Sequence, residues 1–368
     1  MDIVPYLKLM AEKEASDLFF SVGAPVSIKI NGLTQPLNQE PLSDGEVEKL
    51  VHAITTEAQR SSFAETLELN FSHALEGVGR YRVNVYRQRG DVAMVVRYIK
   101  TRIPTIAELQ MPPILADLVM EPRGLVLVVG ATGSGKSTTL ASMIDHRNIH
   151  QSGHILTIED PIEFMHSHKK SVVDQREVGL DTLSYASALK NAMREAPDVI
   201  LIGEIRDRET MQHAIAYAET GHLCLSTLHA NNANQAIDRI INFFPDTAHH
   251  QLRVDLSMNL RAVISQRLVK GIDNKLVPAV EIMLRTPYIS DLIERGEIDL
   301  LKDSIAKGRD GGMQTFDQSL FDLWKSGKIS AEQTLANADS RNNLSVQMRL
   351  AKGAGAGKDN LTMDESQY

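Results

Sequence analysis

Residues 130–137 read Gly-Ala-Thr-Gly-Ser-Gly-Lys-Ser, a glycine-rich loop that ends in a lysine and a hydroxyl residue. The loop follows the apolar run Leu125–Val129 and precedes residues 136–147, whose pattern predicts a helix. This order of strand, loop and helix is the context that the P-loop pattern requires. No other feature constrains the fold as strongly, because it places a buried strand, a tight turn and a helix start within about twenty residues.

The chemistry of this loop follows from its residue types. Glycines let the backbone curl so that successive N–H groups point inward at phosphate oxygens, and the helix start adds partial positive charge. We expect Lys136 to reach the β- and γ-phosphates of a nucleotide and Ser137 to place its hydroxyl on Mg²⁺. The predicted nucleotide-binding residues are Gly130, Ala131, Thr132, Gly133, Ser134, Gly135, Lys136, Ser137 and Thr138.

Beyond the loop, apolar strand-length runs alternate with helix-like segments as far as residue 244. Strands that are apolar throughout, with helices between them, indicate a mostly parallel sheet that is covered on both faces. After Pro245 we expect mainly helices, except for a hairpin near residues 271–274 that leads into a strand at 277–284. The predicted strands of the sheet are Leu125–Val129, Ile155–Ile158, Val199–Ile202 and Leu223–Leu228.

The first 100 residues predict a separate, smaller α/β unit. A helix is expected at 3–14, strands at 17–22 and 26–30, a second helix at 43–56, and a hairpin of strands 80–88 and 92–99. We therefore divide the chain into an N-terminal domain (1–100), a proline-containing linker (101–123), an ATPase-type core (124–285), C-terminal helices (286–350) and a flexible tail (351–368).

Composition excludes several classes of protein. The 368 residues carry a net charge of −8 and 5% aromatic residues, which disfavours nucleic-acid binding by the whole molecule. The single cysteine, Cys224, excludes a disulfide framework and a multi-cysteine zinc site. The first residues do not resemble a signal peptide, and no apolar run approaches the roughly 20 residues of a membrane helix. We expect a cytoplasmic protein.

Three further segments place polar residues at strand ends, where ligands bind in α/β sheets. Glu159 and Glu163 follow one strand, Glu204 follows the next, and His222 and His229 flank a third. Each carboxylate could instead be solvated or paired, and each histidine could simply hold a loop.

In this order, the segments resemble the Walker A, Asp-box, Walker B and His-box motifs of the type II/IV secretion ATPase superfamily. The likeness is greatest to the type IV pilus retraction ATPases of the PilT/PilU family, and extends through Arg80–Asn84, Ile237–Arg239 and Val263–Gln266. It implies a PAS-like N-terminal domain followed by a RecA-like P-loop ATPase domain with a helical C-terminal extension. It also implies a homo-hexameric, Mg²⁺-dependent ATP hydrolase that drives pilus retraction and twitching motility from the cytoplasmic face of the inner membrane.

The resemblance also implies roles for individual residues. Glu163 is predicted to polarise the attacking water and Glu204 to lie near Mg²⁺, although the two glutamates could exchange roles. His229 would sense the γ-phosphate or bridge subunits. The basic hairpin would supply arginine fingers, a role for which the candidates are Arg82, Arg97 and Arg80. The same arginines could form a nucleic-acid surface or a solvated strand face.

One segment departs from the family pattern. Where PilT-type proteins carry Ala-Ile-Arg-Asn-Leu-Ile, this chain reads Tyr-Ile-Ser-Asp-Leu-Ile at 288–293, with Ser290 in the place of the arginine. Together with the tail, this favours the PilU type, an accessory retraction motor that acts with a PilT-type motor and an inner-membrane platform protein. The absence of a four-cysteine zinc module counts against the pilus-assembly ATPases. The alternative is a nucleotide-dependent, ring-forming assembly factor whose own hydrolysis is dispensable, and a nucleic-acid translocase is disfavoured.

Overall fold

In the computed structural model, which describes residues 2–30, 32–99 and 101–356, the chain divides into two compact units. The first comprises Met1–Ile103, Pro161–His166 and Gly179–Asp181, and the second comprises Pro104–Asp160, Ser167–Val178 and Thr182–Tyr368. The predicted α/β class, with an N-terminal domain and a RecA-like domain, is confirmed. No helix in the described ranges is both long enough and apolar enough to cross a membrane.

The first unit is a six-stranded antiparallel sheet in the order β3-β2-β1-β6-β5-β4. Apolar side chains of its three helices, such as Leu7, Leu50 and Phe63, share one hydrophobic core with the sheet. The elements are α1 (Val4–Glu12), β1 (Asp17–Phe20), β2 (Ser27–Ile30), β3 (Leu33–Pro36), α2 (Glu46–Ile54), α3 (Glu57–Thr66), β4 (Glu68–Leu75), β5 (Gly79–Gln88) and β6 (Asp91–Ile99).

The predicted hairpin of basic strands is present as β5 and β6, but β3, α3 and β4 were not predicted. Helix α3 begins with a capping box, in which Thr56 accepts from the backbone of Gln59 while the Gln59 side chain accepts from the backbone of Thr56. In β4, Leu69 and Phe71 alternate with exposed residues, so the strand carries the expected period of two.

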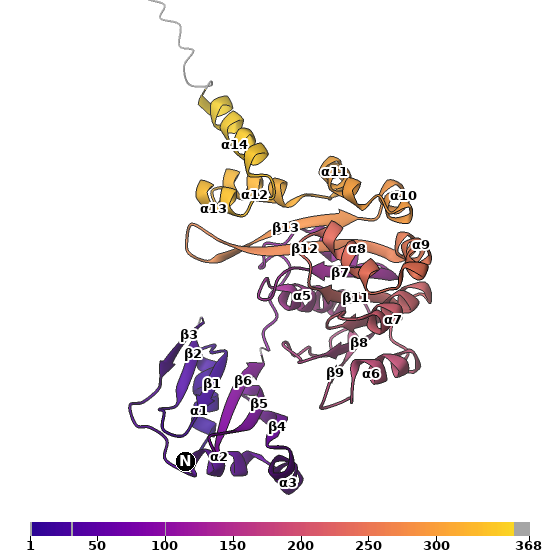
Figure 1. Cartoon of the computed structure of the whole chain (residues 1–368). Helices are drawn as coiled ribbons and strands as arrows, with labels where there is room; N and C mark the ends of the chain where they lie inside the picture. The colour runs from indigo at the N-terminus through magenta and orange to yellow at the C-terminus, as the bar shows by residue number, and fades with distance from the viewer. Residues whose placement is uncertain (1, 31, 100, 357–368) are drawn as a thin grey trace, which may run out of the picture. The chain divides into compact units, whose positions relative to one another are not determined.

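The second unit is built on a seven-stranded sheet in the order β13-β12-β7-β11-β10-β8-β9 (Figure 1). Every neighbouring pair is parallel except the hairpin of β12 and β13. Its strands are β7 (Gly124–Val129), β8 (Gly153–Glu159), β9 (Ser171–Glu177), β10 (Val199–Ile202), β11 (Leu223–Leu228), β12 (Leu260–Lys270) and β13 (Leu276–Leu284).

Helices cover both faces of this sheet, as the apolar strands predicted. The helices of this unit are α4 (Ile114–Met120), α5 (Lys136–His150), α6 (Tyr185–Ala192), α7 (Arg208–Glu219), α8 (Ala233–Asn242), α9 (His249–Asn259), α10 (Pro287–Arg295), α11 (Leu301–Lys307), α12 (Phe316–Lys325), α13 (Ala331–Ala336) and α14 (Arg341–Ala356), with 3-10 turns at Met193–Glu195, Asp246–Ala248, Ile298–Leu300 and Arg309–Gly311. Strand β9 was missed in the sequence. After Pro245 the predicted hairpin near residues 271–274 is present as β12 and β13, but its first strand begins already at Leu260, in a region expected to be helical.

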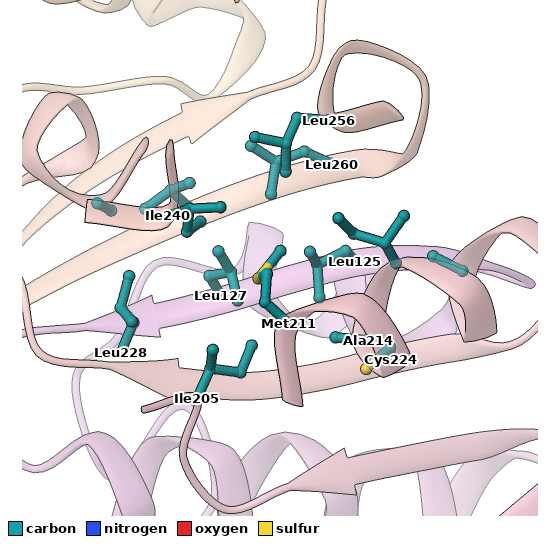
Figure 2. Close-up of a cluster of buried hydrophobic side chains, with 14 of the residues drawn as sticks. Leu125, Leu127, Ile205, Met211, Ala214, Cys224, Leu228, Ile240, Leu256 and Leu260 are labelled. Atoms are coloured by element: carbon teal, nitrogen blue, oxygen red, sulfur yellow. The ribbon is translucent and has the colours of Figure 1, made fainter. Parts of the chain in front are cut away.

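The core shows why β7 is apolar at every position. Leu125 and Leu127 point to one face, where they meet α7 and α9, while Val126 and Val128 pack on the other face against α4 and α5. Figure 2 shows the first of these clusters, with Met211 and Ala214 of α7 beside the strand. A strand buried on both faces must be apolar throughout, and it holds the loop that follows it in a fixed place.

The C-terminal helices form their own small core with the β12–β13 hairpin. Phe316, Leu320, Leu344 and Met348 pack against Val269. Helix α14 continues to Ala356, six residues into the segment expected to be a flexible tail, and the rest of that segment lies outside the described residues.

Candidate nucleotide site in the second unit

The phosphate loop lies at the carboxyl end of β7, between β11 on one side and β12 on the other. Gly133 and Gly135 have φ values of +79° and +89°, a conformation that other residues adopt only at a cost. Helix α5 begins at Lys136, directly after Gly135. The strand, loop and helix therefore follow one another as predicted.

Lys136 is almost completely buried and anchors the start of the loop. Its ammonium group donates to the carbonyl oxygens of Gly130 and Ala131, both at 2.9 Å. These bonds close the loop over the first turn of α5, which points the helix N-terminus and the ammonium group at the same small region.

Glu204 follows β10, and both of its carboxylate oxygens have basic partners. His229 Nε2 lies 2.9 Å from one oxygen, and Arg206 Nε donates to the other at 2.7 Å. The strand end is fixed by Thr227, whose hydroxyl donates to the carbonyl of Gly203 at 2.7 Å. The structure thus brings Glu204 and His229 together, with Arg206 as the second partner of the Glu204 carboxylate.

The two histidines that flank β11 lie at opposite ends of that strand. His229 follows the carboxyl end, on the side of the phosphate loop. His222 precedes Leu223, and its ring is 3.1 Å from the Thr220 hydroxyl and 3.2 Å from the Tyr217 carbonyl. His222 therefore holds a turn at the edge of the sheet away from the phosphate loop.

Two hollows flank the loop. One, of about 590 Å³, is lined by Gly130, Ala131, His229, Asn231, Arg239 and neighbouring residues of α8. The other, of about 290 Å³, is lined by the loop residues 130–134 together with Asn231, Gln266, Arg267, Leu268 and Asn337. Polar side chains line both, so the loop has room for a charged ligand.

A carboxylate cluster surrounds a tyrosine that the sequence analysis missed. The Tyr185 hydroxyl lies so close to Gly203 that a Cβ at position 203 would be 2.8 Å from it. Burial, followed by the charge of Asp160, raises the pKa of Tyr185 well above its usual value, although Arg206 opposes the shift. The phenol therefore stays neutral beside the acids and can donate a hydrogen bond.

Gln266 and Arg267 are the other residues that the sequence analysis did not assign. Gln266 accepts a buried hydrogen bond of 2.7 Å from Thr139 in α5. In the sequence they are a polar pair inside the segment that folds as β12, and Gln266 had appeared only within a stretch of family likeness.

The remaining predicted residues belong to the first unit. Arg82 and Arg97 are directly opposite each other on β5 and β6, and Arg97 Nε donates to the buried Asp17 at 2.8 Å. Arg80 donates to Ser72 at 2.6 Å. Glu163 lies in Pro161–His166, which groups with the same unit.

Comparison with known proteins decides the family. Residues 85–305 match the family described as type II/IV secretion system protein. The chain is 52% identical to the type IV pilus ATPase PilU of Pseudomonas aeruginosa over 97% of this chain and 94% of that protein.

The chain belongs to the type II/IV secretion system protein family. It is also 45% identical to the type IV pilus retraction ATPase PilT of the same organism, over 92% of this chain and 98% of that protein. Among solved structures, it resembles the pilus retraction motor PilT with bound ADP, with a TM-score of 0.87 and 41% identity over 94% of this chain and 99% of that one. The ATPase DotB of Legionella pneumophila matches with a TM-score of 0.76 and 26% identity over 91% of this chain and 96% of that chain.

Proposed function

We propose that this protein is an ATP hydrolase that powers type IV pilus retraction as an accessory motor, acting with a PilT-type partner. The observation that carries the proposal is the 52% identity to a pilus ATPase over nearly the whole chain, including a complete phosphate loop. Within the proposal, the protein forms a homo-hexamer at the cytoplasmic face of the inner membrane and contacts a platform protein there.

The residues at the loop fit a magnesium ion. Mg²⁺ prefers oxygen ligands and is usually held by one or two protein groups together with substrate phosphates. The Ser137 hydroxyl, in the first turn of α5, and the Glu204 carboxylate are such groups. Over the described part of the chain, no three acidic, histidine or cysteine side chains cluster as a metal cage. When bound, the ion would neutralise charge on the β- and γ-phosphates.

The chain's own residues would then act in sequence. Lys136 leaves the carbonyls of Gly130 and Ala131 to bind phosphate oxygens, since a phosphate is a stronger partner for an ammonium group than a neutral carbonyl. A carboxylate, Glu163 or Glu204, orients the attacking water. His229 would respond to a change at Glu204, because its Nε2 lies 2.9 Å from Glu204 Oε1.

The arginines of the first unit complete the proposal. Arg80, Arg82 and Arg97 lie on one face of the sheet, since Arg82 pairs with Arg97 and Arg80 is two residues from Arg82. In our proposal, this face supplies positive charge to the γ-phosphate in the transition state. Such arginines are worth about 10³–10⁵ in rate in other P-loop enzymes.

The biochemical test is Lys136→Ala, with Lys307→Ala as the matched control, because Lys307 is an exposed lysine in the last turn of α11. ATP turnover should be lost in the first variant and retained in the second. If the Lys136→Ala variant still hydrolyses ATP, the proposal that this protein hydrolyses ATP at the phosphate loop is wrong.

The genetic test separates the motor from the alternative assembly factor. Lys136→Ala protein is expressed in a deletion strain that has an active PilT-type partner, and twitching is measured. We expect no assistance from rings that cannot hydrolyse ATP. Full assistance would instead favour a scaffold whose own hydrolysis is dispensable.

A further inference from the structure

Gln266 lies beside the phosphate loop although it is 130 residues away from Lys136 along the chain. Its neighbour Ser265 pairs with Val129, the last residue of β7, so the end of β12 runs next to Gly130. The approach is close: a Cβ at Gly130 would be 2.5 Å from the carbonyl oxygen of Gln266. Gln266 as a whole is only 4% exposed.

The side-chain amide of Gln266 reaches the far end of the same loop. Its Oε1 accepts from the Thr139 hydroxyl in the first turn of α5. Its Nε2 lies 2.9 Å from the position that a Cβ would take at Gly135. One residue therefore contacts the first glycine of the loop, the last glycine, and the helix that follows.

Gln266 is itself held from the opposite face of β12. The next residue, Arg267, points the other way, stacks on the Phe316 ring at 3.8 Å, and pairs with Asp339 at 2.8 Å. Arg267 also donates to the carbonyl of Asn337 at 3.0 Å. These contacts tie the end of β12 to α12 and to the segment between α13 and α14.

We propose that Gln266 is a positioning residue of the nucleotide site, which fixes the spacing between the start of the phosphate loop and helix α5. The inference rests on the proposed function, because it assigns to Gln266 a share of the nucleotide affinity of that site. A neutral amide suits the place. A carboxylate of the same shape would be attracted to the N-terminus of α5, where it would compete with the phosphate for the backbone N–H groups and repel it.

The test compares Gln266→Met with Gln314→Met. Methionine removes the amide at similar volume, and Gln314 is a half-buried glutamine that donates to the carbonyl of Val280 instead of contacting the loop. Magnesium-ADP binding is measured by calorimetry, and ATP turnover is measured alongside. We expect Gln266→Met to raise the Kd for ADP and the KM for ATP about tenfold, because the hydrogen bond from Thr139 that supports the loop is lost. The kcat should be nearly unchanged. Gln314→Met should bind ADP as the wild type does.

Three further variants separate a positioning role of Gln266 from an effect on stability alone. Gln266→Glu keeps the length and the hydrogen-bond acceptor, so we expect it to fold but to bind ADP more weakly than Gln266→Met. Thr139→Val removes the hydroxyl donor of the same hydrogen bond that Gln266→Met breaks. The double variant Gln266→Met/Thr139→Val should therefore bind ADP no more weakly than the weaker-binding of the two single variants.

The outcomes are distinct. A wild-type protein that binds no ADP would refute the proposed function and this inference with it. A wild type that binds ADP, with Gln266→Met unchanged, would overturn the inference alone. So would strictly additive losses in the double variant, or weaker binding that merely follows a lower melting temperature of the free protein.

Discussion

Alanine substitutions at Gly133 and Gly135 of the phosphate loop allow the free energy of the contact between Gly135 and Gln266 to be measured. Gly133 and Gly135 have similar φ values, +79° and +89°, so Gly→Ala at either position forces an L residue into the same unfavourable region. That backbone cost is about 1–2 kcal/mol. The gain from restricting the unfolded chain, about 0.4–1 kcal/mol, is common to both variants and cancels in their difference.

The two positions differ in their surroundings. A Cβ at Gly133 meets nothing within 4 Å, whereas a Cβ at Gly135 lies 2.9 Å from Gln266 Nε2. To relieve that contact the amide must move, which breaks its bond to Thr139, a loss of about 1 kcal/mol. We therefore expect Gly135→Ala to be less stable than Gly133→Ala by about 1 kcal/mol.

Urea unfolding followed by tryptophan fluorescence measures this difference. Trp324 in α12 is the only tryptophan of the chain, so the signal reports on the second unit. In a Thr139→Val background the difference between the two alanine variants should shrink towards zero, because the hydrogen bond is already absent. Equal midpoints for Gly133→Ala and Gly135→Ala in the wild-type background would refute the reasoning.

Three other predictions concern two buried side chains of the second unit, Glu281 and Cys224, and the partly covered carboxylate of Asp339. Burial raises the pKa of Glu281 despite the hydrogen bond that it accepts from the Ala233 N–H at 2.9 Å, so the folded state holds a proton that the unfolded state loses above about pH 4.5. The free energy of unfolding of the wild type should then decrease as the pH rises above that value. In Glu281→Gln it should depend less on pH, as measured by urea unfolding at pH 5 to 8. Burial alone would raise the pKa of Asp339, but the hydrogen bond from Lys302 and a nearby guanidinium hold it below its usual value. Asp339→Asn should therefore destabilise the protein at pH 7 and much less near pH 3, and an equal loss at both pH values would contradict the ion pair. Cys224 is fully buried and its pKa is raised by burial, so a thiol reagent should label it only in urea; rapid labelling of the native protein would show that this core opens.

Local patterns along the sequence predicted the elements around the phosphate loop. An apolar strand, a glycine-rich loop and a helix start are encoded in consecutive residues, and the structure has them there. Only the end of β12 was implied by the predicted hairpin near residues 271–274. Most of the strand was not predicted, because Arg261, Ser265 and Gln266 interrupt its apolar run although both of its faces are buried. A strand of that kind shows neither alternation nor a continuous apolar segment.

The site shows the same division. The sequence alone determined that a phosphate loop is present and that acids and histidines follow particular strands, because each motif is a local pattern. Only the tertiary structure decided which of them meet. Parallel pairing brought His229 to Glu204 and left His222 at the other end of β11, and the position of β12 beside β7 joined Gln266 to Thr139 across 127 residues. Strand order depends on the packing of the whole sheet, and no local stretch of sequence encodes it.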